Sequence, residues 1–204
     1  MLEGAGGGTV INNLQIKRGE TPTGASQPRL ISTIRDGFHI NGPKYGTTIK
    51  KCFVEYTGDD AVNVRSEFPM IVSIQGNTVT LSIPWAYFFA GDTLWVYDGS
   101  SYAFITAVSI VSHTIETNVF TLNSTNGISL GMRVISPEHM KYFQIVDNVF
   151  QDIEGRGVVA TGLSIIIENN VIARTTLGGI WVGAEMGIFI LYSFQIKKRF
   201  FVLV

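Results

Sequence analysis

The chain has 204 residues, of which 46% are hydrophobic and 15% charged, a balance that excludes a disordered chain and a charged coiled coil. The 15 basic and 16 acidic residues give a net charge of −1. Because no basic excess is present to hold a phosphate backbone, we expect no nucleic-acid partner.

Several kinds of site and segment are not expected. Cys52 is the one cysteine, so it can form neither an internal disulfide nor a cysteine metal cluster, and we expect it to be a small core residue. His39, His113 and His139 lack the spacing typical of metal ligands, and no metal or other cofactor is expected. The longest apolar stretch, 187–192, falls far short of the ~20 residues that span a bilayer, so no membrane partner is expected. No signal peptide is visible, which leaves the localisation open.

The first predicted element is a pair of similar coils within residues 4–67. Residues 11–16 and 49–54 each carry apolar side chains at their first and sixth positions. A second motif, an aspartate followed by alternating apolar residues, begins at Asp36 and again 24 residues later at Asp60. Each coil would therefore contribute two short strands.

Residues 68–139 lack this repeat and alternate apolar and polar side chains over short runs. Residues 70–74 and 78–81 flank the pair Gly76–Asn77, which is typical of a β-hairpin turn. We expect residues 68–139 to form a small antiparallel β-barrel inserted into one coil.

The repeat returns within residues 140–187. Segments 145–150 and 167–172 match the earlier pair and start 22 residues apart, and the strands 156–160 and 178–182 begin 11 residues after those starts. A period of 22–24 residues with short strands predicts a right-handed parallel β-helix, whose coils stack about 4.8 Å apart. A β-sandwich is the alternative, because strands alone do not fix the topology.

The alternation along the second motif predicts which side chains fill the interior. They are Phe38, Ile40, Val62, Val64, Val158, Ala160, Ile180 and Val182. We expect the outer wall to carry His39, Asn63, Val159 and Trp181. Stacked asparagines can hydrogen-bond the turn backbone and one another, and Asn148 and Asn170 fit that role at a corner.

Residues 188–204 form an atypical tail without the repeat. No capping element precedes the first coil, although the open ends of a β-helix need covering. We therefore expect the chain to be a fragment, or the tail to come from a misread gene boundary.

Three carboxylates, Asp36, Asp59 and Asp60, are the candidate catalytic residues, since the repeat brings them to one corner of neighbouring coils. Crowded acids repel one another, which favours one protonated acid beside ionised neighbours. Glycosidases use one protonated carboxyl group as acid and one ionised carboxylate as base, and inverting enzymes hold the two about 6.5–9.5 Å apart. The alternative is that Asp59 and Asp60 form a solvated turn and cap its backbone.

Five further residues are candidates for substrate binding. Arg156 shares the register of Asp60, so it would hold that aspartate ionised or bind a sugar hydroxyl, unless it forms only an exposed ion pair of little energy. Trp181 could offer an indole face for sugar stacking, or simply pack. His39, Asn63 and Glu185 complete the set, and each could equally be an ordinary surface residue.

The stretch from Asp36 through Gly58-Asp59-Asp60-Ala-Val-Asn63 resembles the active-site region of glycoside hydrolase family 110, and the resemblance covers roughly residues 8–187. That family comprises inverting α-1,3-galactosidases whose parallel β-helix is interrupted by a β-barrel directly after an Asp-Asp-Ala-x-Asn segment. The resemblance implies that Asp59 is the general acid, while Asp36 and Asp60 position and deprotonate water. It also implies a glycan substrate, no metal, and secretion or a periplasmic location.

Other functions remain open at this stage. The motifs also resemble those of polygalacturonases. The Asn-Thr-Asp, Gly-His-Gly and Arg-Ile-Lys signatures of those enzymes are missing, however, which favours a neutral galactoside as the substrate. A calcium-dependent polysaccharide lyase with Arg156 as base is one alternative. A non-catalytic glycan-binding or adhesin module is another, and a fragment could be inactive.

Overall fold

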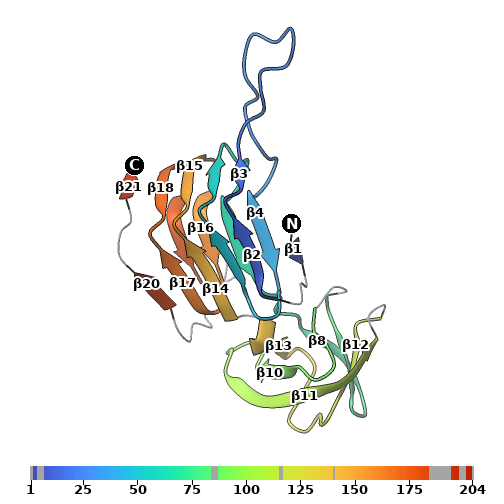
Figure 1. Ribbon diagram of the computed structural model, residues 1–204. Helices are drawn as coiled ribbons and strands as arrows, with labels where there is room; N and C mark the ends of the chain where they lie inside the picture. The colour runs from blue at the N-terminus through green and yellow to red at the C-terminus, as the bar shows by residue number, and fades with distance from the viewer. Residues whose placement is uncertain are drawn as a thin grey trace. The chain divides into compact units, whose positions relative to one another are not determined.

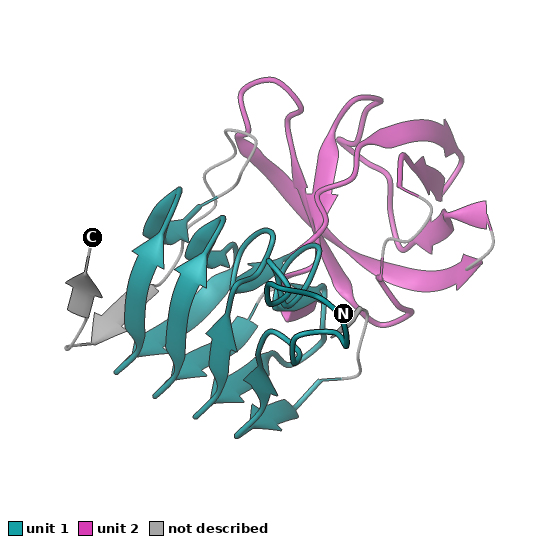
Figure 2. Ribbon diagram, turned by 90° about the horizontal axis from the view of Figure 1, so that it is seen from above, with its two compact units in different colours: residues 1–65, 140–204 teal, residues 66–139 magenta. Residues whose placement is uncertain are grey.

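The computed structural model describes residues 2–3, 7–83, 87–114, 117–139, 141–183, 194–197 and 201–203. The chain divides into two compact units, one formed by residues 1–65 and 140–204 and the other by residues 66–139 (Figure 2). Among the described residues, no helix is long and apolar enough to cross a membrane.

The first unit consists of three parallel sheets, named A, B and C here, to which successive turns of the chain add strands in the order B, C, A (Figure 1). Sheet A contains β1 (Leu2–Glu3), β4 (Phe38–Asn41), β7 (Val62–Arg65), β16 (Arg156–Ala160) and β19 (Gly178–Val182). Sheet B contains β2 (Thr9–Asn12), β5 (Thr47–Lys50), β14 (Lys141–Val146), β17 (Leu163–Glu168) and β20 (Phe194–Lys197). Sheet C contains β3 (Gln15–Ile16), β6 (Phe53–Glu55), β15 (Val149–Ile153), β18 (Val171–Thr175) and β21 (Phe201–Leu203).

Strand register confirms the predicted repeat and, with it, the all-β parallel β-helix. The prediction of two strands per coil is wrong: each coil adds three, because a corner divides segments such as 49–54 between β5 in sheet B and β6 in sheet C. In sheet B, Ile49 pairs with Ile11 on one side and with Ile145 on the other. In sheet A, Val62 lies between Phe38 and Val158 in the same way. The β-sandwich alternative is wrong, because all three sheets of this unit are parallel and each coil contacts only its neighbours.

The interior of the β-helix holds the apolar set that alternation predicts. Its buried members from sheet A are Phe38, Ile40, Val62, Val64, Val158 and Ala160, against which Ile180 and Val182 pack. Cys52 is buried in the same cluster, as expected. On the outer wall, Val159 pairs with Asn63 and Trp181 and lies outside the interior cluster, as alternation predicts, but Val159 is only 1% exposed and Asn63 only 7%.

The corner between sheets B and C carries the predicted asparagine ladder. Asn148 Nδ2 donates to the Ile49 carbonyl at 3.1 Å and to Asn170 Oδ1 at 2.8 Å, while its own Oδ1 accepts the Cys52 amide at 2.9 Å. Asn170 Nδ2 donates to the Ile145 carbonyl at 2.7 Å. The two side chains thereby satisfy buried backbone groups that no strand can pair.

Two of the sheets also continue into residues 194–197 and 201–203. Strand β20 pairs in parallel with β17, and β21 pairs in parallel with β18, so both extend existing sheets. These strands were not foreseen, because the sequence pattern of the repeat stops before them.

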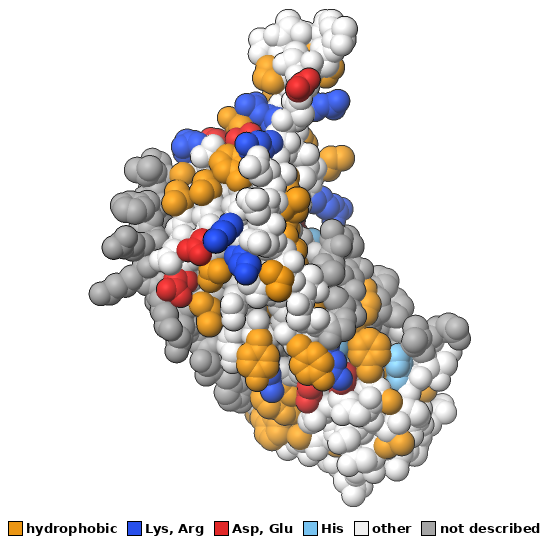
Figure 3. All heavy atoms as spheres, in the orientation of Figure 1, with side chains coloured by type: hydrophobic (Ala, Val, Ile, Leu, Met, Phe, Trp, Pro, Cys, Tyr) orange, Lys and Arg blue, Asp and Glu red, His pale blue; other side chains and the backbone are white. Residues whose placement is uncertain are grey.

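A long loop, residues 17–37, connects β3 to β4 and projects from the coils (Figure 1). Basic side chains gather where the loop meets the coils (Figure 3). The guanidinium of Arg18 lies 3.4 Å from the centre of the Tyr56 ring, and the ammonium of Lys17 lies 4.8 Å from that of Phe53. These cation–π contacts hold the outgoing end of the loop against sheet C.

The second unit is a six-stranded antiparallel sheet in the order β13-β10-β11-β12-β9-β8. Its strands are β8 (Ile71–Gln75), β9 (Thr78–Leu81), β10 (Thr93–Tyr97), β11 (Phe104–Thr114), β12 (Val119–Leu122) and β13 (Arg133–Ile135). The first and last strands meet through the Ile71 amide, which donates to the Met132 carbonyl at 2.7 Å, and the Val134 amide, which donates to the Pro69 carbonyl at 3.0 Å. These bonds close the sheet into a small barrel around its own apolar core.

Candidate functional site

The returning end of the long loop places Asp36 beside the next coil. Thr33 bridges in parallel to Thr57, and the Gly58 amide donates to the Thr33 carbonyl at 2.9 Å. The Gly37 amide then donates to the Asp60 carbonyl at 2.9 Å. Gly58 allows this approach, because a Cβ on it would lie 2.6 Å from the Ile34 carbonyl oxygen. The backbone therefore fixes Asp36 against Asp60 across 24 residues of sequence.

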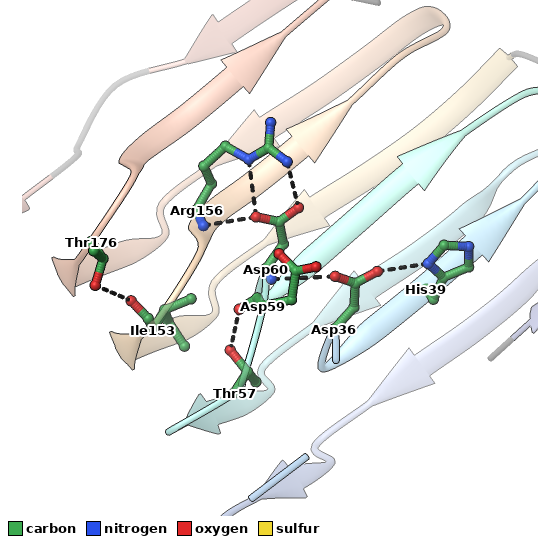
Figure 4. A network of polar contacts seen from close by, with 8 residues as sticks. All are labelled: Asp36, His39, Thr57, Asp59, Asp60, Ile153, Arg156 and Thr176. Carbon is green, nitrogen blue, oxygen red and sulfur yellow. Dashed lines mark hydrogen bonds and ion pairs between the residues drawn. The ribbon is translucent and has the colours of Figure 1, made fainter. Parts of the chain in front are cut away.

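The three predicted carboxylates do come together at this corner. Asp36, Asp59 and Asp60 each offer one oxygen within 4.8 Å of the other two (Figure 4). The stacking of coils that the repeat predicted is what produces this cluster, since Asp36 precedes β4 and Asp60 precedes the adjacent strand β7.

Asp60 is the buried member of the cluster and is paired with Arg156 from the third coil. Arg156 Nε donates to Asp60 Oδ1 and Arg156 Nη2 donates to Asp60 Oδ2, both at 3.0 Å. The Arg156 backbone amide adds a third bond to Oδ1 at 2.7 Å. The Asp60 side chain is only 1% exposed, so this is a shielded two-pronged ion pair and not the weak exposed pair that was one reading of the sequence.

Asp36 is paired with His39 on the following strand. Its Oδ2 lies 2.6 Å from Nδ1 of His39, and its Oδ1 accepts the Asp60 backbone amide at 3.2 Å. The His39 side chain is 20% exposed and that of Asp36 is 7% exposed. His39 thus contacts a candidate catalytic carboxylate, which the sequence did not indicate.

Asp59 is the one exposed carboxylate of the three. Desolvation of its carboxyl group raises the pKa of Asp59 above its ordinary value, and the negative charges of Asp60 and Asp36 raise it further. A backbone hydrogen bond from Asp60 and the charge of Arg156 oppose these effects in part. Asp59 is consequently the member most suited to carry a proton and deliver it to a bound molecule.

The cluster is compact enough for its three carboxylates to contact one cation. Two of the three are already neutralised or bonded, however, since Arg156 engages both oxygens of Asp60 and His39 engages Asp36. A cation would have to displace these partners, so we assign no metal here.

The other predicted residues lie at different places relative to this cluster. Asn63 is the register partner of His39 on β7, is 7% exposed, and has a buried Oδ1 without a hydrogen-bond partner. Trp181 is 49% exposed on β19, two strands beyond Asn63 on the same outer wall. Glu185 lies outside the described residues.

Two residues that sequence reasoning missed shape the backbone of the cluster. The buried Thr57 Oγ1 donates to the Asp59 carbonyl at 2.6 Å. Gly155 packs against the same turn, and a Cβ on it would lie 2.6 Å from Asp60 Oδ1 and 2.7 Å from the Asp60 amide nitrogen. The Gly-Arg pair before a strand was the available signal for Gly155, but only the stacked coils reveal the close approach.

Comparisons with known proteins assign no family to this chain. No protein-family model matches the chain, and a comparison with curated proteins finds no match. Among solved structures, the chain is similar to the tailspike protein gp49 from Pseudomonas phage LKA1, with 15% sequence identity and a TM-score of 0.28 over 74% of this chain and 35% of that one. The chain therefore spans about a third of that tailspike's length. At this TM-score the likeness says nothing about function, and the strand pairing alone establishes the β-helix.

Proposed function

We propose that this chain belongs to a carbohydrate-acting protein and that its carboxylate cluster hydrolyses a glycosidic bond, with terminal α-1,3-linked galactose as the substrate. The observation that carries the proposal is the environment of Asp59. An exposed carboxyl group with a raised pKa stands beside two carboxylates that have hydrogen-bond partners of their own, His39 for Asp36 and Arg156 for Asp60. Glycoside hydrolysis needs this division between a proton donor and ionised neighbours.

The roles follow from what each group can do. Asp59 would protonate the oxygen of the leaving sugar, because it is accessible and its raised pKa makes it keep a proton better than an ordinary aspartate does. Asp36 and Asp60 would stand on the side of the attacking water, as the resemblance to the galactosidase family implies. Arg156 holds the Asp60 carboxylate in place through its paired hydrogen bonds.

The charge of the cluster supports a neutral substrate. Asp36 and Asp60 are carboxylates even when Asp59 carries its proton, and within the described part of the chain Arg156 is the guanidinium paired with the cluster, so the site is negative overall when His39 is neutral. A sugar carboxylate would be repelled by this excess. A galactoside is therefore a better substrate than a galacturonide, and Arg156 is poorly suited to be a lyase base because it is ion-paired and holds its proton.

The test uses the 204-residue chain with a panel of α- and β-linked galactosides. We expect release of galactose from an α-1,3-linked substrate, with NMR showing the β-anomer first, as inversion requires. Asp59→Asn should lower kcat by about 10²–10⁴-fold, the usual contribution of a general acid. Wild-type protein without turnover on the whole panel would refute the proposal.

A glycan-binding module without catalysis is the second candidate, and the exposure of Trp181 favours it. Its indole ring is 49% exposed on a rigid strand, where it can stack on the face of a sugar. Glycan binding that Trp181→Ala abolishes, in a protein without hydrolysis, would support this reading over the first.

A further inference from the structure

The identity of the group that takes the proton from the attacking water is open, because Asp36 and Asp60 are both engaged. Both oxygens of Asp60 accept hydrogen bonds from Arg156, and 1% of the side chain is exposed. Asp36 accepts bonds on both oxygens as well, and 7% of its side chain is exposed. A water molecule therefore has little access to a lone pair on either carboxylate.

Distance raises a second difficulty for these carboxylates. Oxygens of Asp36 and Asp60 lie within 4.8 Å of an oxygen of Asp59. In inverting glycosidases, acid and base stand about 6.5–9.5 Å apart, because the anomeric carbon and a water molecule must fit between them. A base somewhat farther from Asp59 would fit that requirement better.

His39 is more accessible than either carboxylate and lies on the far side of Asp36 from Asp59 (Figure 4). An ionised carboxylate only accepts hydrogen bonds, so the 2.6 Å contact with Asp36 requires the proton of a neutral His39 ring to be on Nδ1. The lone pair is then on Nε2, the nitrogen that does not face Asp36. The ring is 20% exposed and extends from Asp36 away from Asp59 (Figure 4). Among the residues that the structure describes, Asp36 is the one acidic side chain paired with this ring, and the register partner Asn63 is uncharged.

We propose that His39 is the general base of this site and that Asp36 orients it, an inference that rests on the glycosidase function proposed above. Nε2 of His39 takes one proton from water while the water oxygen bonds to the anomeric carbon. The glycosidic C–O bond breaks with its electron pair on the leaving oxygen, which takes the proton of Asp59. The sum is one water consumed, one free sugar and one free alcohol, and solvent then returns the proton from His39 to Asp59.

One substitution, His39→Asn, distinguishes a general base from a residue that only donates a hydrogen bond to Asp36. The side-chain amide of His39→Asn can still donate to Asp36 from about the position of Nδ1, but it offers no basic nitrogen at Nε2. We expect kcat of His39→Asn to fall about 10²–10⁴-fold and to recover in part with added imidazole. If His39→Asn keeps kcat within tenfold of wild type, His39 is not the base and the proposal is wrong.

The pH profile gives an independent readout. With a histidine base, kcat/KM should fall as the pH drops through the range in which imidazoles take up a proton, between about pH 8 and 5. With a carboxylate base, activity would persist to more acidic pH, which would overturn the proposal. Retention of anomeric configuration would overturn it too, because Asp36 would then be a nucleophile.

Failure of the proposed function can be told apart from failure of this inference. If wild type hydrolyses galactosides and Asp59→Asn does not, an active His39→Asn refutes the base alone. If no galactoside is hydrolysed, ¹⁵N NMR still reports the tautomer, and the signals of His39 among the three histidines are those lost in His39→Asn. A neutral ring protonated on Nδ1 supports the arrangement, whereas one protonated on Nε2, or a ring charged at neutral pH, refutes it.

Discussion

Asp60 and Arg156 are 96 residues apart in sequence and are joined by three hydrogen bonds, one from the backbone amide and two from the guanidinium of Arg156. The pair crosses directly from the coil before the barrel to the coil after it, since β7 and β16 are neighbours in sheet A. It therefore serves both the candidate site and the stacking of the two coils.

Removing one partner of this pair should destabilise the protein. Arg156→Met leaves the carboxylate of Asp60 buried and without its counter-charge, which typically costs about 3–5 kcal/mol. Urea denaturation at neutral pH would measure the loss. Arg174→Met is the matched control, because Arg174 also forms a bidentate ion pair with an aspartate, Asp152, but its side chain is 52% exposed. We expect that control to unfold as wild type does, and equal losses in both variants would contradict the prediction.

Asp59 should make stability depend on pH in a direction opposite to that of most acids. Its pKa is raised in the folded state by desolvation and by the charges of Asp60 and Asp36. The folded state therefore holds this proton more tightly than the unfolded state does, and stability falls as the pH rises through the raised pKa. Asp59→Asn cannot ionise, so relative to wild type it should gain stability between acidic and neutral pH. Denaturation curves of both proteins at several pH values would test this. If the stability of Asp59→Asn relative to wild type increased as the pH was lowered, the prediction would be contradicted.

Gly155→Ala should disturb the site by steric overlap, without removing any polar group. The added Cβ would lie 2.6 Å from Asp60 Oδ1, so the carboxylate or the turn must shift and the bonds to Arg156 must weaken. We expect a lower melting temperature and a loss of any hydrolytic activity. Gly19→Ala is the control, since its Cβ would meet only the flexible Arg29 side chain at 3.4 Å. Normal melting of Gly155→Ala would show that the turn is not tightly packed.

The asparagine ladder can be extended by one step. Cys52 occupies the ladder position one coil before Asn148, and its sulfur lies 3.8 Å from the Ile11 carbonyl that an amide would reach. Cys52→Asn should donate to that carbonyl and add about 0.5–1.5 kcal/mol to the free energy of unfolding. In the reverse experiment, Asn148→Ala should lower the free energy of unfolding by at least about 1 kcal/mol, because it leaves the buried Ile49 carbonyl without its hydrogen-bond donor. A loss in Cys52→Asn would indicate that the corner has no room for the amide.

The fold could be read from the sequence because its determinants recur. Ile11, Ile49 and Ile145 mark the same position of successive coils, so a period was visible without any knowledge of the turns between them. The meeting of Asp36 with Asp60 followed from the same period.

The finer structure of the site could not be read in this way, because it depends on distances that no period encodes. The contact of His39 with Asp36 depends on a side-chain rotamer, and the role of Gly155 depends on how closely two turns approach. The burial of Val159 likewise depends on what covers the outer wall, whereas alternation specifies only which wall a side chain faces. The strands β20 and β21 show that backbone pairing can extend a sheet where the side-chain pattern has ended.

The barrel has a consequence for the order in which the molecule assembles. Every pairing between the second and third coils joins positions 96 residues apart, and closing so long a loop costs about 1 kcal/mol more than closing one of 22 residues. Inside the barrel, however, the hydroxyl of Ser66 donates to the carbonyl of His139 at 2.6 Å, so its entry and exit points are adjacent. A barrel that has folded first thus acts as a short linker, and the parallel strands on either side can then find each other almost as readily as strands within an uninterrupted array.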